Sequence, residues 1–285
     1  MRSLWKSGGI ENRFMDMTVT KKEKNEIVMM DFSGIYEEEK FWKEEKVSWV
    51  NARDISGTNC YCDEEARMAL REKIADFPAG GIHFIDSGNY HYMSLLWLEK
   101  IDRPFRLLVF DNHTDMQPPA FGGLLSCGGW IASALEELEN LKEVILVGPD
   151  EEAYGQVEEE FRKKVRFLSR ENLEDCRTQE GDILSLVKNF FREMDMELPL
   201  YLSVDKDVLS PMSAHTTWSQ GDMSLEELKA CLKMILSYYK ENCGELIGMD
   251  VCGECDSKGD GSSERNDRAN EELLEVTGKG AAFEK

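Results

Sequence analysis

The sequence predicts an α/β fold, a single three-layer α/β/α domain built around a mostly parallel sheet. Short apolar runs alternate along the chain with segments whose apolar residues recur at helical spacing, which is the pattern of β-α-β units. With 285 residues and 41% hydrophobic content, the chain is long enough to bury the core of one large sheet. One domain therefore accounts for the whole pattern.

Short apolar runs mark the predicted strands of this sheet. The first 24 residues, 1–24, show no such periodicity, and we expect them to form a flexible leader. Residues 25–255 then form the main domain. The predicted strands are 27–32, 47–50, 82–85, 106–110, 143–147, 200–204 and 246–251.

Segments with apolar residues on one face separate these strands and are predicted as helices. The first of them ends at Pro78 and the glycines that follow, which do not continue a helix. The last one lies in 256–285, which we assign as a C-terminal helix and tail of the same domain. The predicted helices are 62–77, 92–101, 130–141, 182–194, 225–239 and 264–276.

The charge and cysteine content exclude several classes of protein. Lys and Arg number 34 and Asp and Glu 56, which gives a net charge of -22. A surface this acidic does not bind nucleic acid, which needs clustered cations. Eight cysteines are too sparse for a disulfide scaffold. No apolar run approaches the roughly 18 residues of a membrane helix, so we expect a cytoplasmic protein with no membrane partner.

Aspartates follow four of the predicted strands: Asp86, Asp111, Asp205 and Asp250. Any one of them could be an ordinary turn or helix-capping residue. In an open parallel sheet, however, ligands bind outside the carboxyl ends of the strands. The repeated placement therefore predicts a functional site at that edge.

Two of these aspartates begin denser clusters of candidate metal ligands. In 111–115, DNHTD, the side chains of Asp111, His113 and Asp115 alternate, so an extended strand end can turn all three toward one point. In 203–207, SVDKD, Asp205 and Asp207 repeat the arrangement, and two carboxylates this close repel unless a cation neutralises them. Carboxylate oxygens mixed with imidazole favour Mn²⁺ or a similar ion.

These segments resemble the signatures of the ureohydrolase superfamily, the arginase and agmatinase group. Its GGDH, DAHxD and SxDxDxxDP segments correspond in order to 87–91, 111–115 and 203–211, and the resemblance covers about residues 82–254. It implies an arginase/deacetylase-like fold and two Mn²⁺ ions. Asp111 and Asp205 would bridge the ions, His91 and Asp115 would complete one, and His113 and Asp207 would complete the other.

The resemblance also implies an activity, the hydrolysis of a linear C–N bond in a guanidino or amide compound. Two cations would activate a water molecule, and Asp115 would carry the proton to the leaving nitrogen. The family's arginine enzymes have a loop histidine that is missing from 125–130, LSCGGW, so we expect a guanidino compound other than free arginine. Trp130 in this loop could pack on an apolar part of the substrate, or begin a helix and face the core.

Several positions depart from the family pattern. His91 lies one residue later than the family's histidine, so Tyr90 could take its place, and Ser210 replaces the last aspartate. Glu254 corresponds, displaced by one position, to a glutamate that meets the substrate guanidinium. His215 follows the strand with metal ligands and could shuttle protons, or simply hydrogen-bond its neighbours.

Two alternatives to a binuclear hydrolase stay open. A deacetylase of the same fold would use a single zinc ion to cut an amide, and a non-catalytic relative would bind metal or a partner without turnover. The substrate is expected to be a small molecule or to be borne on a peptide, and homo-oligomerisation is left open. Cys60, Cys62, Cys252 and Cys255 could form a zinc site, but we expect them to be buried structural residues, like His83.

Overall fold

A computed structural model describes residues 26–118, 122–179, 181–192, 197–255 and 262–283. Its centre is an eight-stranded sheet with the order β2-β1-β4-β10-β9-β5-β7-β8, in which every strand pair is parallel. The predicted leader, 1–24, lies outside the described residues. The strands are β1 Ile27–Asp31, β2 Val47–Asn51, β4 Gly81–Phe84, β5 Phe105–Phe110, β7 Leu141–Val147, β8 Val165–Leu168, β9 Leu200–Asp205 and β10 Leu246–Cys252.

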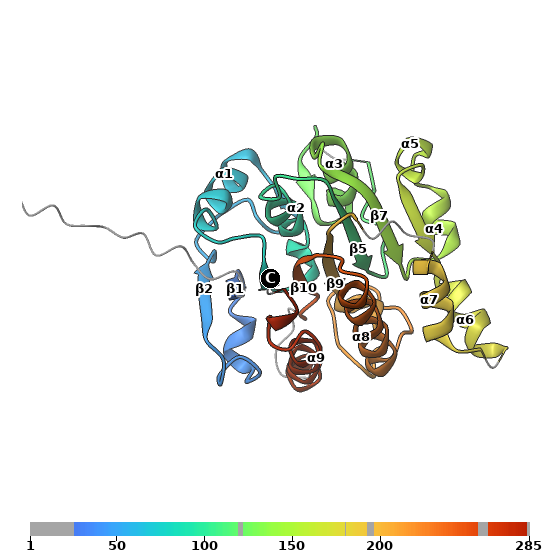
Figure 1. Cartoon of the computed structure of the whole chain (residues 1–285). Coiled ribbons are helices and arrows are strands. Elements are labelled where there is room, and N and C mark those ends of the chain that lie inside the picture. Colours follow the sequence, from blue (N-terminus) through green and yellow to red (C-terminus); the bar gives the residue numbers. More distant parts are fainter. Residues whose placement is uncertain (1–25, 119–121, 180, 193–196, 256–261, 284–285) are drawn as a thin grey trace, which may run out of the picture.

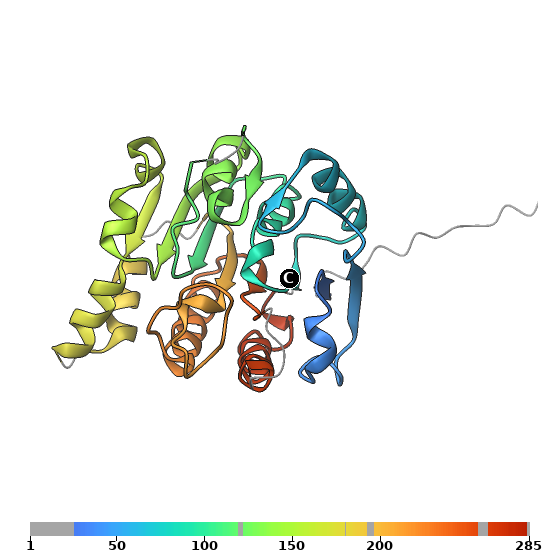
Figure 2. The same cartoon turned by 180° about the vertical axis from the view of Figure 1, so that it is seen from behind.

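Helices cover both faces of the sheet, so the predicted three-layer α/β/α fold is confirmed (Figure 1). One face carries α1 Glu64–Lys73, α2 Met93–Leu98 and α3 Trp130–Glu137, and the other carries α7 Ile183–Arg192, α8 Leu225–Glu241 and α9 Ser262–Val276. Both views place β1 and β2 at one edge of the sheet and the segment α4 to α7 at the other (Figure 2). The shorter helices of that segment are α4 Glu151–Gly155, α5 Glu159–Arg162 and α6 Arg170–Thr178.

The strands are apolar on both faces because each face has its own core. In β5, Leu108 and Phe110 belong to one hydrophobic cluster, whereas Leu107 and Val109 belong to the other. A parallel sheet covered on both sides buries successive residues in this way, which explains why the sequence shows continuous apolar runs and no alternation.

The predicted elements agree with the structure within a few residues, with clear exceptions. The helix predicted for 62–77 is shorter, because Cys62 pairs with Leu125 in a small antiparallel sheet of β3 Tyr61–Cys62 and β6 Leu125–Ser126, and Asp63 caps α1. Edge strand β8 was missed, since three of its four residues are only partly buried. None of the described helices could cross a bilayer.

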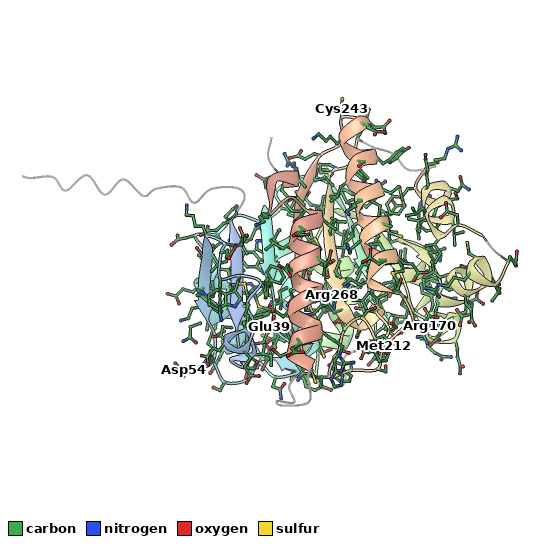
Figure 3. All side chains as sticks on the ribbon, turned by 90° about the horizontal axis from the view of Figure 1, so that it is seen from below. Glu39, Asp54, Arg170, Met212, Cys243 and Arg268 are labelled. Carbon is green, nitrogen blue, oxygen red and sulfur yellow. The ribbon has the colours of Figure 1, made fainter. Side chains whose placement is uncertain are left out.

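The C-terminal helix α9 shares its core with α8. Ala269 and Leu273 are buried in the same cluster as Leu232. Figure 3 shows these two helices side by side, with Cys243 at one end of the molecule and Met212 and Arg170 at the other. Met212 and Arg170 follow β9 and β8, so their end of the molecule is the edge where the strands have their carboxyl ends.

His83 and three of the four cysteines that we expected to be buried structural residues are buried, whereas Cys60 is the exception. His83 in β4 is fully buried and stacks on Trp97, with ring centroids 3.7 Å apart. Among the four cysteines considered for a zinc site, Cys62, Cys252 and Cys255 are buried, whereas Cys60 is partly exposed.

Candidate metal centre and active site

The carboxyl ends of β4, β9 and β5 bring the predicted ligands together; β9 and β5 are adjacent, and β10 lies between β4 and β9. His91 follows the short 3-10 turn η2 Gly88–Tyr90 after β4, Asp111 follows β5 and Asp205 ends β9. Asp115 has a left-handed backbone, with φ of 49°, which turns the chain after Asp111 back toward the cluster. Strain of this kind at a non-glycine residue is typical of functional sites.

The first ligand group surrounds the imidazole of His91. Its Nδ1 atom lies 3.3 Å from Oδ2 of Asp111, 3.0 Å from Oδ2 of Asp115 and 3.5 Å from Oδ2 of Asp205. The four side chains are at most 7% exposed. Tyr90 is not part of the group, because its ring stacks on Phe32 with centroids 4.1 Å apart.

The second ligand group is built on His113. Its Nδ1 atom lies 2.8 Å from Oδ2 of Asp207 and 3.5 Å from Oδ1 of Asp111. Asp111 therefore offers one oxygen to each group. Backbone N–H groups hold these carboxylates in place: that of His113 donates to Asp111 at 2.6 Å, and that of Asp207 donates to Asp205 at 2.8 Å.

Both groups fit divalent metal ions. Nδ1 of His91 and Oδ2 of Asp111 are buried and have no hydrogen-bond partner among the described residues, and such atoms are costly unless something binds them. Two donors that each lie about 2.0 to 2.2 Å from one ion are separated by roughly 3 Å, close to the separations observed here. The predicted ligands therefore have the arrangement that a metal needs.

A chain of hydrogen bonds fixes which nitrogen of His91 faces the site. The Ser203 hydroxyl donates to Oδ1 of Asp250 at 2.6 Å, so its oxygen is left to accept the Nε2–H of His91 at 3.0 Å. Nδ1 then carries the lone pair and points at the three carboxylates. A partner that orients an imidazole in this way is a regular feature of metal sites.

The charges of the carboxylates conflict in the absence of cations. Burial and the charge of Asp111 raise the pKa of Asp205 and hold that of Asp207 well above its usual value. The same causes raise the pKa of Asp115 to about 7. Asp111 itself is buried, yet hydrogen bonds from His113 and His91 lower its pKa. Cations at the site would allow all four carboxylates to ionise.

A cavity of about 230 Å³ leads to the ligands. His113, Asp115, Asp205 and Asp207 line its floor. The remaining lining residues come from five segments and include two aromatic side chains, Tyr61 and Trp218, that sequence reasoning missed. These residues are 60–61, Gly88, 117–118, 126–128 and Trp218.

Trp130 does not line this cavity, so the predicted substrate contact is wrong and its alternative, a buried start of a helix, is what the structure has. The indole begins α3 and is fully buried. Its Nε1 donates to Oδ2 of Asp115 at 2.7 Å. Trp130 therefore helps to hold Asp115, a candidate metal ligand, in position.

Glu254 also faces away from the cavity. Its carboxylate is 1% exposed, pairs with Nζ of Lys206 and accepts from Nδ2 of Asn270 at 2.8 Å. The residue beside the ligands is Gly253, where an added Cβ would lie 2.4 Å from Oδ1 of Asp205. The displacement by one position thus turns Glu254 to the other side of the chain, which contradicts the predicted contact with substrate.

His215 lies outside the residues that line the cavity. Its backbone N–H donates to Oδ1 of Asn266, and its carbonyl accepts from Nδ2 of Asn266, both at 2.8 Å. These bonds tie the loop after β9 to α9. The structure therefore removes the geometric basis for the predicted proton shuttle.

Cys252, the last residue of β10, is a further group at the centre. Its thiol is fully buried and donates to Oδ2 of Asp205 at 3.1 Å. The sulfur, the imidazole of His91 and the carboxylate of Asp205 lie within 4.8 Å of one another. Its position two residues after Asp250, on the same side of a strand end, was the available signal in the sequence.

An all-parallel α/β sheet with imidazoles and carboxylates clustered at its carboxyl edge defines a protein with a candidate two-ion metal centre. Residues 50–275 match the Arginase family, and the chain belongs to this family. An uncharacterized protein of Thermotoga maritima is 32% identical over 235 residues, which cover 81% of this chain and 80% of that protein.

Solved structures share the fold at low identity. The proclavaminate amidino hydrolase of Streptomyces clavuligerus has a TM-score of 0.63 and 14% identity, and the match covers 92% of this chain and 94% of that one. The formiminoglutamase of Trypanosoma cruzi, solved with Mn²⁺, has a TM-score of 0.60 and 13% identity over 94% of this chain and 97% of that one. The agmatine ureohydrolase of Thermoplasma volcanium has a TM-score of 0.61 and 14% identity, and the match covers 91% of this chain and 90% of that one.

Proposed function

We propose that the protein hydrolyses a linear C–N bond in a guanidino or amidino compound other than free arginine, with two Mn²⁺ ions. The observation that carries the proposal is the pair of ligand groups joined by Asp111, at the floor of a cavity. The structural relatives add support, since they include an amidino hydrolase and a ureohydrolase.

The charge of the site favours two divalent ions over one. Asp111, Asp115, Asp205 and Asp207 carry four negative charges when ionised, which two divalent cations balance. His91 and Asp115 would complete the site of one ion and His113 and Asp207 that of the other, with Asp111 and Asp205 shared. Oxygen donors mixed with imidazole suit Mn²⁺.

Two divalent cations bound at this site would favour the loss of a proton from water at neutral pH and would polarise the bond to be cut. The residues of this chain do the rest. The floor carboxylate of Asp115, held by Trp130, is placed to take a proton and return it to the leaving nitrogen. The burial of Asp115, Asp205 and Asp207 limits the screening of these charges by bulk water.

Turnover of a substrate panel tests the proposal. Full-length protein loaded with Mn²⁺ should release urea or ammonia from guanidines or amidines, and Asp205→Asn should lose this activity while remaining folded. Asp102→Asn, at an exposed aspartate on the opposite edge of the sheet, should keep it. If no guanidine or amidine is hydrolysed and an acetylated amine is cut with zinc instead, the single-zinc alternative replaces this one.

We further propose that the protein works in the cytoplasm on a small-molecule or peptide-borne substrate.

The non-catalytic alternative predicts that the protein binds metal but turns over no compound of the same substrate panel. The panel therefore separates all three readings.

A further inference from the structure

We infer that the substrate carries an uncharged, planar group attached to its guanidino or amidino group directly or through a short linker, and that Tyr61 and Trp218 bind this planar group. The inference rests on the proposed function and narrows it to a substrate class. Aryl and arylalkyl guanidines or amidines are the simplest members of that class.

The charge of the cavity lining is the first observation. Apart from the candidate metal ligands on the floor, no described lining residue is a Lys, Arg, Asp or Glu. A free carboxylate or ammonium on the distal part of a substrate would lose water there without gaining an ion pair, which is unfavourable. Once cations balance the floor carboxylates, no net charge is left to attract such a group.

The two aromatic side chains are the second observation. Tyr61 is 36% exposed and Trp218 is 43% exposed, and both line the same cavity. Large exposed aromatic surfaces that border a cavity commonly await an apolar partner. Tyr61 comes from β3 and Trp218 from the loop after β9, so two separate parts of the fold supply them.

Trp218 is held in a fixed position over the centre. Its Nε1 donates to Oδ1 of Asn89 at 2.9 Å, and its ring meets the ring of His113 edge to face at 6.2 Å. Gly88 leaves room for it, because an added Cβ there would lie 2.9 Å from Cδ1 of the indole. With its polar atom already bonded, the indole has only apolar surface to offer to a ligand.

The size and remaining polarity of the cavity agree with a small ring. Its volume of about 230 Å³ is below the roughly 300 to 1,000 Å³ of pockets for drug-sized ligands. Gln117 supplies a neutral amide on one wall, where its Oε1 lies 3.3 Å from a Cβ placed at Gly128. A neutral polar substituent can hydrogen-bond to this amide without requiring a charge.

The test compares matched substrates on Mn²⁺-loaded full-length protein. Benzylguanidine is expected to have a kcat/KM at least about tenfold above those of agmatine and L-arginine, which carry a distal charge. Trp218→Ala and Tyr61→Ala should each raise KM for benzylguanidine by about three- to tenfold, with kcat and metal content little changed. Met212→Ala is the control, since this side chain is 86% exposed and outside the lining.

The outcomes separate this inference from the proposed function. Equal or better turnover of agmatine or arginine, together with unchanged KM in both aromatic variants, would overturn the inference and leave the hydrolase in place. If nothing is turned over, titration calorimetry with benzylguanidine still decides. Binding that Trp218→Ala weakens supports the aromatic subsite without the hydrolase, and absence of binding overturns the subsite.

Discussion

The Ser203 hydroxyl joins a buried carboxylate, Asp250, to a candidate metal ligand, His91. Without this hydroxyl the imidazole loses the acceptor that keeps Nδ1 unprotonated toward the site. We expect Ser203→Ala to lower Mn²⁺ affinity by about 10- to 100-fold, the usual effect of removing such a partner. Calorimetric titration with MnCl₂ measures it, and Ser185→Ala, at an exposed serine of α7, should bind like the parent. An unchanged affinity in Ser203→Ala would show that the relay does not orient His91.

His215 follows the strand that carries candidate metal ligands, and its substitution tests whether it takes part in catalysis. Its backbone is held by Asn266 and it does not line the described cavity. We therefore expect His215→Asn to keep kcat within about twofold of the parent, far from the roughly 10² to 10⁴ loss expected for a proton carrier. A large loss that added imidazole rescues would restore the shuttle.

His83 should make stability depend on pH, because burial lowers its pKa to about 3 from the usual value of about 6.5. Between these values only the unfolded chain takes up the proton. Protonation of His83 in the unfolded chain therefore lowers the free energy of unfolding as the pH falls below about 6.5, by about 1.4 kcal/mol per pH unit. Above that pH, His83 is neutral in both states and this loss is absent.

His83→Gln removes this titration. The advantage of the parent over the variant in unfolding free energy should thus shrink by about 2 kcal/mol between pH 6.5 and pH 5. Urea unfolding at both pH values measures the difference. An advantage that stays constant would mean that His83 is protonated in the folded protein.

Residue identity predicted which candidate ligands lie together, but not the direction of every side chain. Asp111, His113, Asp205 and Asp207 could be assigned because alternate residues at a strand end share one side. The orientation of Glu254 could not, because it depends on partners such as Lys206 and Asn270 that pack against it from other segments. The burial of Trp130 likewise depends on its bond to Asp115, which periodicity does not reveal.

Among the elements, the loop after β9 and the end of β10 are joined by a buried ion pair. Lys206 is fully buried and pairs with Glu254, while Asn270 of α9 bonds to both. Burial and the charge of Glu254 raise the pKa of the nearby Glu39 to about 10, so Glu39 is neutral there. Lys206 is then the cation that compensates Glu254.

Removing one partner of this pair leaves the other charge buried. We expect Lys206→Met to lower the unfolding free energy of the metal-free protein by about 3 to 5 kcal/mol, and the double variant Lys206→Met/Glu254→Gln to recover part of it. Urea denaturation of Lys206→Met, Glu254→Gln and the double variant measures this coupling. Losses that simply add would contradict a pairwise interaction.

The elements that periodicity predicted are those with long apolar faces. Strands β5, β9 and β10 and helices α7 and α8 agree with the prediction because both sheet faces are buried. The pair β3 and β6 has two residues in each strand, too few for a pattern. That small sheet supplies Tyr61 and Ser126 to the cavity wall, so the sequence did not reveal the element that carries one of the two aromatic residues of the proposed substrate subsite.

At the scale of the whole molecule, the fold holds the candidate metal ligands in two groups that share the carboxylate of Asp111. An eight-stranded parallel sheet brings the carboxyl ends of β4, β5 and β9 to one edge, although these strands are far apart in the chain. The strand order belongs to the fold that this chain shares with its family, whereas the proposed substrate preference depends on the residues of the cavity walls. The central claim therefore concerns the centre itself.

A count of bound metal tests that claim most directly. Protein loaded with Mn²⁺ and freed of excess ions should contain two manganese ions per chain by elemental mass spectrometry, while Asp205→Asn should retain less than one and Asp102→Asn two. The metal-loaded parent should also melt at a higher temperature than the metal-free chain. One zinc ion per chain with no retained manganese, or two manganese ions in Asp205→Asn, would contradict the proposed binuclear centre.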